Sequence, residues 1–107
     1  MATKLAIITA VGAGAVKIEW SGLGTGDDGD WVNTARFRKI TAHVSGTATT
    51  FALQGSNEAA GANPQTVKDA NNTAITGAGL HEVQQVPGSL RPLLTTGTAV
   101  TVTLTCS

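Results

Sequence analysis

The chain has 107 residues, with seven basic and seven acidic side chains, so its formal net charge is zero. This length suits one domain with a single modest core. The basic residues are scattered, which excludes nucleic acid as an expected partner, because binding phosphates requires a basic excess or stripe. No apolar run approaches the ~18 residues of a membrane span, so a membrane is not an expected partner either.

Charged residues make up only 13% of the chain, about half of their usual share. The surface must therefore consist largely of Thr, Ser, Gly, Ala, Asn and Gln. Such a surface favours association over mutual repulsion, so we expect the protein to lie against other copies or a larger assembly. Cys106 is the only cysteine, which excludes an internal disulfide and indicates folding in a reducing compartment.

Strand signals begin at the N-terminus. Leu5 to Ala10 predicts a first strand, and the apolar run is too short and too quickly followed by another strand for a signal peptide. We therefore expect synthesis in the cytosol. Gly12 to Gly14 predicts a tight turn, and the apolar/charged alternation of residues 16–20 predicts a half-buried strand.

The middle of the chain alternates loops and short strands. Ser21 to Asp30 predicts a long polar loop, and residues 37–44 and 49–54 predict two strands hinged at Ser45-Gly46. A second loop is expected from Ser56 to Pro64. Short strands are expected near residues 66–68 and 73–75.

The last third alternates polar and apolar residues. Residues 80–86 have mixed polarity, which is typical of an exposed or inter-subunit strand. Pro87-Gly88 predicts a turn into a strand over 90–94. Alternating Thr and apolar residues over 99–105 predict the final strand.

Eight or nine short strands at regular spacing are typical of a sandwich or barrel. The predicted fold is all-β: a jelly-roll-like antiparallel β-sandwich of about eight short strands, in one domain over residues 1–107. The core must come from Val, Ile, Leu and Ala, with four large fillers: Trp20, Trp31, Phe37 and Phe51.

The acidic loop is the one weak candidate for a metal site. Asp27, Asp28 and Asp30 could supply carboxylates to Ca²⁺, although their spacing does not match an EF-hand. Clustered Asp and Gly are also ordinary loop chemistry, because Asx side chains bond their own backbone. Trp31, directly after the loop, is interpreted as a plug over the sandwich end, with a ligand platform as the alternative.

No residue cluster predicts catalysis. His43 and His81 lack a third ligand or a close partner, and the Gly-rich stretch 22–26 follows a strand without opening a helix. Nothing resembles a nucleophile elbow, an HExxH pair or a phosphate loop. The sequence therefore predicts no enzymatic activity, no catalytic residue and no cofactor.

Three arginines are candidate contact residues. Arg36 and Arg38 are expected on one face of a strand, either as a solvated surface or as a patch for an acidic partner. Arg91 precedes Pro92, which holds it in an extended conformation. An ion pair of Arg91 with Glu82 or Glu58 is expected.

Four segments together resemble a family of small bacteriophage virion proteins. They are a strand ending in a Gln-Gly-Ser-Asn turn, a Gly-Leu-x-Glu-Val strand, an Arg-Pro strand and a Thr/Val-alternating final strand, here 53–57, 79–83, 90–94 and 98–104. These proteins are capsid decoration, or cement, proteins of jelly-roll type. The resemblance covers about half of residues 47–105.

The resemblance implies a structural virion protein on the capsid surface, made in the host cytoplasm. Its partners would be its own copies, as a trimer at local three-fold sites, and the major capsid protein. The candidate contact residues are Leu5, Ile7, Arg36, Arg38, Glu82 and Arg91, with the first strand from Leu5 to Ile8.

Two alternatives remain open. The Gly-Ser-Asn turn with a following acid also occurs in discoidin-like and galactose-binding-like domains, so a carbohydrate-binding module is one. This chain departs from their common pattern, because no Gly directly follows Glu58 and no Trp stands in the turn. The other alternative is a tail- or fibre-associated domain of the virion.

Overall fold

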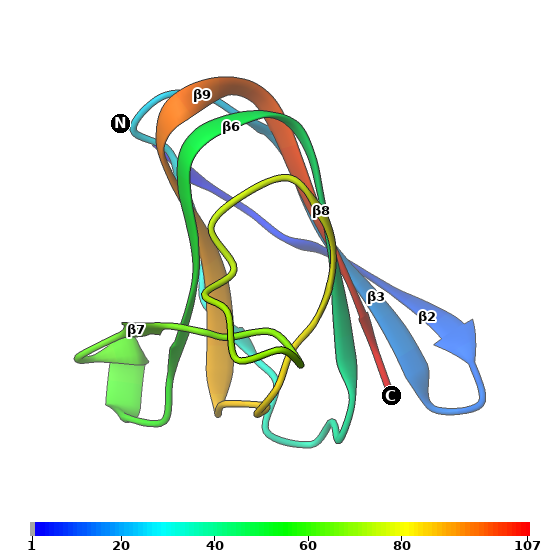
Figure 1. Ribbon diagram of the computed structural model, residues 1–107. Coiled ribbons are helices and arrows are strands. Elements are labelled where there is room, and N and C mark those ends of the chain that lie inside the picture. Colours follow the sequence, from blue (N-terminus) through cyan, green and yellow to red (C-terminus); the bar gives the residue numbers. More distant parts are fainter. Residues whose placement is uncertain (1) are drawn as a thin grey trace.

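Two very long strands form the frame of the molecule. In the computed structural model, which describes residues 2–107, β6 (Ile40–Ser56) and β9 (Ser89–Cys106) pair antiparallel over almost their whole length. Both strands bend in the middle (Figure 1). The halves on either side of the bend therefore belong to two facing layers of one continuous sheet.

The bend is built from local backbone chemistry. Gly46 has φ = +99°, a conformation that favours glycine, and an added Cβ would collide with the carbonyl oxygen of Ala99. Register shifts between Ser45 and Thr47 mark bulges, which let the hydrogen-bond ladder continue around the corner. The hinge at Ser45-Gly46 is thus confirmed, but it bends one strand and does not separate two.

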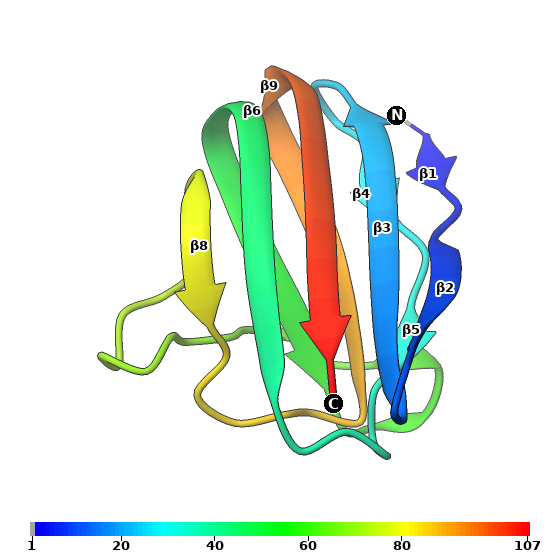
Figure 2. The ribbon, with the colours of Figure 1, turned by 90° about the vertical axis from the view of Figure 1, so that its right-hand side faces the viewer.

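The first layer, called the front sheet here, contains five strands. Their order is β8 (Gly79–Glu82), β6 up to the bend, β9 beyond its bend, β3 (Ala15–Leu23) and β2 (Ile7–Gly12), and all neighbours are antiparallel. Figure 2 shows β8 at one side of this sheet and β2 at the other.

The second layer, called the back sheet, is made from the other halves of β6 and β9 and several two-residue strands. These are β7 (Gln65–Thr66), β4 (Asp28–Gly29), β5 (Val32–Asn33) and β1 (Thr3–Lys4), which pairs parallel with β4. A 3-10 turn, η1 (Ala59–Gly61), follows β6. No helix in residues 2–107 is long and apolar enough to span a membrane.

The core lies between the two layers. Its buried apolar residues are Ile18, Trp20, Leu23, Val32, Phe37, Ile40, Ala42, Val44, Phe51, Leu53, Ile75, Val83, Leu90, Leu94, Val100, Val102, Leu104 and Cys106. The predicted all-β sandwich and three of its four large fillers are confirmed. Trp31 is the exception: it is only partly buried, because it packs against Arg91 outside this core.

Several predicted boundaries are wrong. The first long strand begins at Ile7, not Leu5, and the strand expected over 80–86 ends at Glu82. The expected loop 21–30 contains β4, which pairs with β9. A strand of two residues is too short to show a period-2 pattern, so it can be recognised only from its pairing with another strand in the structure.

Candidate binding surfaces

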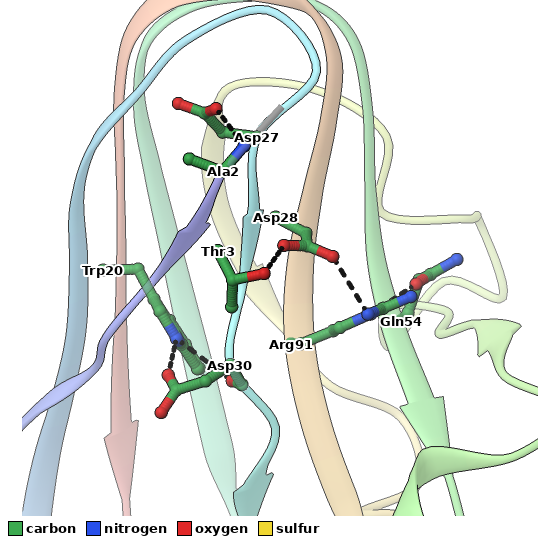
Figure 3. Close-up of polar contacts among 8 residues, drawn as sticks. All are labelled: Ala2, Thr3, Trp20, Asp27, Asp28, Asp30, Gln54 and Arg91. Carbon is green, nitrogen blue, oxygen red and sulfur yellow. Dashed lines mark hydrogen bonds and ion pairs between the residues drawn. The ribbon is translucent and has the colours of Figure 1, made fainter.

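The acidic loop holds the N-terminal segment in place. Asp27 accepts hydrogen bonds from the backbone N–H groups of Ala2, at 3.0 Å, and Gly24, at 2.9 Å. The Gly24 N–H is the main reason that the pKa of the Asp27 carboxyl is lowered. Asp28 accepts a hydrogen bond from the Thr3 hydroxyl at 2.7 Å (Figure 3).

Asp30 joins the same segment to the core. One carboxylate oxygen, Oδ1, accepts from the backbone N–H of Ala6 at 2.8 Å and from Nε1 of buried Trp20 at 3.0 Å. The three carboxylates of the loop therefore bind different partners. Within residues 2–107, no group of three or more His, Cys, Asp or Glu side chains is placed to share a metal ion.

Arg91 is at the centre of a polar cluster on the outer side of the back sheet. Its Nη1 lies 3.1 Å from Asp28 Oδ2, and its Nε donates to Gln54 Oε1 at 2.9 Å (Figure 3). Its guanidinium lies 4.7 Å from the centroid of the Trp31 ring. A Cβ added at Gly61 would collide with the same ring. Trp31 is therefore packed between Arg91 and Gly61 outside the core, and its remaining surface lines a second hollow together with Asn33 and Asn57.

The expected ion pair of Arg91 with Glu82 or Glu58 is wrong. Glu82 lies 3.8 Å from Lys39, and Glu58 accepts a hydrogen bond from Asn63. The cause is topology: β4 pairs with β9 and brings an aspartate beside the arginine.

The Gln-Gly-Ser-Asn turn also serves the fold. The Ser56 hydroxyl donates to the carbonyl oxygen of Ala62 at 2.6 Å and accepts from the N–H of Glu58 at 3.1 Å. Asn57 Oδ1 accepts from the N–H of Gly88 at 2.6 Å. The first two residues of the Gln-Gly-Ser-Asn segment pair with the Arg-Pro segment, Gln54 with Arg91 and Gly55 with Leu90, so two of the segments in the resemblance contact each other.

Arg36 and Arg38 do not lie on a strand. They occupy the turn before β6, where Phe37 points into the core and the backbone N–H of Arg38 donates to the Ser107 carbonyl at 2.8 Å. The Arg36 guanidinium lies 4.4 Å from the centroid of the Phe37 ring. Both arginine side chains are exposed, so they are available for contacts although the expected strand is absent.

A groove of about 660 Å³ with a mixed polar and apolar lining lies beside the turn at 56–58. Its lining combines side-chain amides, one acid and one base with an apolar part of about equal area. The residues are Gly55, Ser56, Asn57, Glu58, Asn63, Gln65, Thr66, Val67, Lys68, Asn72, Gln84, Gln85, Val86 and Pro87. Such a lining can donate and accept many hydrogen bonds to a polar ligand. The sequence indicated the side of this groove that the loop from Ser56 to Pro64 forms. It did not indicate Gln84 and Gln85, which only the tertiary structure brings beside that loop.

The exposed large apolar side chains lie at two edges of the front sheet. Leu5, Ile7, Ile8 and Val11 belong to β2 or the segment just before it, and Leu80 belongs to β8. The structure thus places the predicted contact residues Leu5 and Ile7 together on one edge. It does not bring them near Arg91, which lies on the back sheet.

Comparisons with known proteins show no family. No protein-family model matches the chain, and no curated protein matches it. The solved structure of SPBc2 prophage-derived protein YomS is similar at 16% identity, with a TM-score of 0.49, over 92% of this chain and 100% of that one. A cupin domain from Bordetella pertussis Tohama I is similar at 13% identity, with a TM-score of 0.47, over 100% of this chain and 98% of that one. These similarities are too low to indicate function, and the fold assignment depends on the strand topology described above.

Proposed function

We propose that this protein is a structural component of a bacteriophage particle that binds the outer capsid shell as a decoration protein. It acts as a homo-oligomer, expected to be a trimer at local three-fold sites, and stabilises the shell by contacting several capsid subunits at once. The main observation in favour is the outer face of the front sheet, which is wide and Thr-rich and carries charges of both signs at Lys17, Glu19 and Glu82.

The strand register defines that face. Two cross-strand rows run over it from β8 to β2: Leu80, His43, Thr103, Glu19 and Ile7 form one, and Glu82, Thr41, Thr105, Lys17 and Thr9 form the other. Its threonine hydroxyl groups can contact another protein at a smaller cost in lost hydration than charged groups require, and its three charges can pair with a partner. This face suits a protein partner better than a small ligand, because the groove described above lies outside it.

The mechanism follows from linkage. A protein that binds assembled capsid subunits, and not dissociated ones, shifts the equilibrium toward the assembled shell. A symmetric oligomer also converts several weak contacts into strong overall binding. No catalytic group is needed for either effect.

The test is co-sedimentation of the purified protein with undecorated heads of the phage whose genome encodes it. We expect saturable binding and a higher temperature of shell disruption. Immunogold labelling of virions separates the shell from the alternative tail or fibre position. Heads that leave the protein in the supernatant at every concentration would refute the shell assignment.

Arg36 and Arg38 are proposed contacts with an acidic capsid surface. The double variant Arg36→Ala/Arg38→Ala is expected to weaken head binding and to reduce its dependence on salt. Lys68→Ala provides a control, because it removes an exposed positive charge on a different surface. Unchanged head binding by the arginine variant would exclude the pair from the interface.

A second candidate function is carbohydrate binding, and the amide-lined groove favours it. Asn and Gln side chains donate and accept at once, which suits sugar hydroxyls. The groove lacks an aromatic platform, because Trp31 is packed against Arg91 outside it. An NMR titration with mono- and oligosaccharides is expected to shift the side-chain amides of Gln84 and Gln85. Shifts elsewhere, or none, would refute this candidate.

A further inference from the structure

The apolar surface that the chain leaves in water is concentrated at two opposite edges of one sheet. At the β2 edge the exposed fractions are 77% for Leu5, 61% for Ile7, 57% for Ile8 and 54% for Val11. At the β8 edge Leu80 is 73% exposed. Figure 2 shows these edges on opposite sides of the front sheet.

The β2 edge has little protection against pairing apart from a bulge between Ala10 and Gly12. Every residue of β2 is exposed, and the strand contains no charge and no proline. Ile8 pairs with buried Ile18 and so points to the core side of the sheet, yet it remains in water because the back sheet does not reach under β2. An edge strand that is apolar on both faces is a template for another chain.

We infer that the β2 edge of one copy packs against the β8 edge of the next copy, so that identical contacts close a ring. The expected ring size of three copies depends on the proposed function. A contact between two different edges is heterologous. Copies joined by it form a closed ring when the rotation from one copy to the next divides 360° evenly.

The strand directions permit this contact. Five strands alternate in direction across the front sheet, so β2 and β8 run the same way. A symmetry axis along the strands keeps them parallel in neighbouring copies. Ile7 and Leu80 end the same cross-strand row, and Thr9 and Glu82 end the next one. Ile7 therefore meets Leu80 of the next copy at one level, and the Thr9 hydroxyl meets the Glu82 carboxylate at the next level.

The five exposed side chains supply most, but not all, of the apolar area that such a contact needs. Five side chains that each expose more than half of their surface leave on the order of 500 Å² of apolar area, divided between the two edges. The smallest stable interfaces bury about 1,200 Å² in total, of which roughly 700 Å² is apolar. Pairing of β2 with β2 about a two-fold axis would leave Leu80 in water, whereas the ring covers all five side chains.

The test is disulfide trapping with the double variant Ile7→Cys/Leu80→Cys. Oxidation is expected to give covalent oligomers that end at a closed ring. Native Cys106 does not interfere, because it is fully buried. Thr9→Cys is the matched probe for a two-fold β2–β2 contact, since Thr9 lies at the middle of β2. Covalent dimers from Thr9→Cys and no covalent oligomers from the double variant would overturn the inference.

A second measurement tests the inference even if the cysteine variants do not fold. Light scattering of the Ile7→Glu variant is expected to show association that needs at least about tenfold more protein than the wild type, equivalent to 1.4 kcal/mol. Thr50→Glu places the same charge on an exposed position away from both edges and is expected to leave association unchanged. Equal association of the Ile7→Glu variant and the wild type, or a wild type that stays monomeric at every concentration, would overturn the inference.

The two proposals can fail separately. A ring trapped through Ile7 and Leu80 that does not bind phage heads would refute the decoration function and leave the ring intact. Head binding that persists in the Ile7→Glu variant, with no trapped ring in solution or on heads, would refute the ring and leave the decoration function intact.

Discussion

Replacing Asp30 by alanine tests whether the acidic loop stabilises the fold. In the wild type, its Oδ1 atom accepts two hydrogen bonds, from the Ala6 N–H at 2.8 Å and from the Trp20 indole at 3.0 Å. The second donor belongs to a fully buried side chain. The substitution removes both bonds and leaves the indole N–H with only the Asp30 carbonyl oxygen, at 3.2 Å.

The expected cost follows from these two bonds. A hydrogen bond to a charged group contributes roughly 1.5–3 kcal/mol, and partial exposure of Asp30 places both at the lower end. We therefore expect Asp30→Ala to reduce the free energy of unfolding by about 2–3 kcal/mol. For a domain of this size, that corresponds to a decrease in Tm of roughly 10 °C.

The assay is urea unfolding followed by circular dichroism, at one fixed protein concentration because association would add to stability. Asp27→Ala is the matched control. It removes a neighbouring carboxylate that also accepts two N–H groups, but neither belongs to a buried side chain. Its effect is expected to be much smaller than that of Asp30→Ala.

A double-mutant cycle with Trp20→Phe identifies the partner. If Asp30 acts through the indole, Asp30→Ala must cost less in the Trp20→Phe background, by about 1 kcal/mol or more. Equal losses for Asp30→Ala and Asp27→Ala, or strict additivity with Trp20→Phe, would refute this account of the acidic loop.

Three further predictions concern other parts of the fold. Gly46→Ala is expected to destabilise the protein by more than ~2 kcal/mol in urea unfolding, because the new Cβ would collide with the Ala99 carbonyl in a backbone of positive φ. Gly14 also has positive φ but lies in open space, so Gly14→Ala is the control and is expected to cost less. The pKa of Asp27 is lowered by folding, so its stabilising contribution is present above the unfolded-state pKa and is lost as pH falls through the folded-state pKa. Protection factors of the N-terminal amides should therefore decrease on acidification, and a pH-independent value would contradict this. Burial raises the pKa of the Cys106 thiol to about 11. At pH 8, native protein should therefore react with a thiol reagent far more slowly than unfolded protein. Equal reaction rates would show that the thiol is accessible.

Local patterns predicted the parts of the fold that depend on neighbouring residues. The Thr/apolar alternation of the last strand is observed as buried Val100, Val102 and Leu104 between more exposed threonines. The hinge at Ser45-Gly46 is observed because glycine can adopt the positive φ that the bend requires. Period-2 alternation and a glycine hinge are properties of short segments, so the sequence is sufficient to reveal them.

The candidate contact residues were predicted only in part. Composition and the apolar first strand indicated an associating surface, and Leu5 and Ile7 are indeed exposed. The sequence did not show that Leu80 lies on the opposite edge of the same sheet. That relation depends on the order of five strands, which alternation alone does not define.

The amino-acid sequence by itself therefore determined the all-β class, most of the strands and most of the core, because these follow from alternation and turn chemistry over a few residues. Tertiary structure alone decided what the polar residues do. Asp28 and Arg91 are 63 residues apart in the chain, and they form an ion pair only because β4 pairs with β9. The same pairing places Trp31 over Arg91 and outside the core. An aspartate-rich loop has the same local sequence whether it binds a cation, a solvent shell or its own N-terminus, and only the segments that fold against it decide among these.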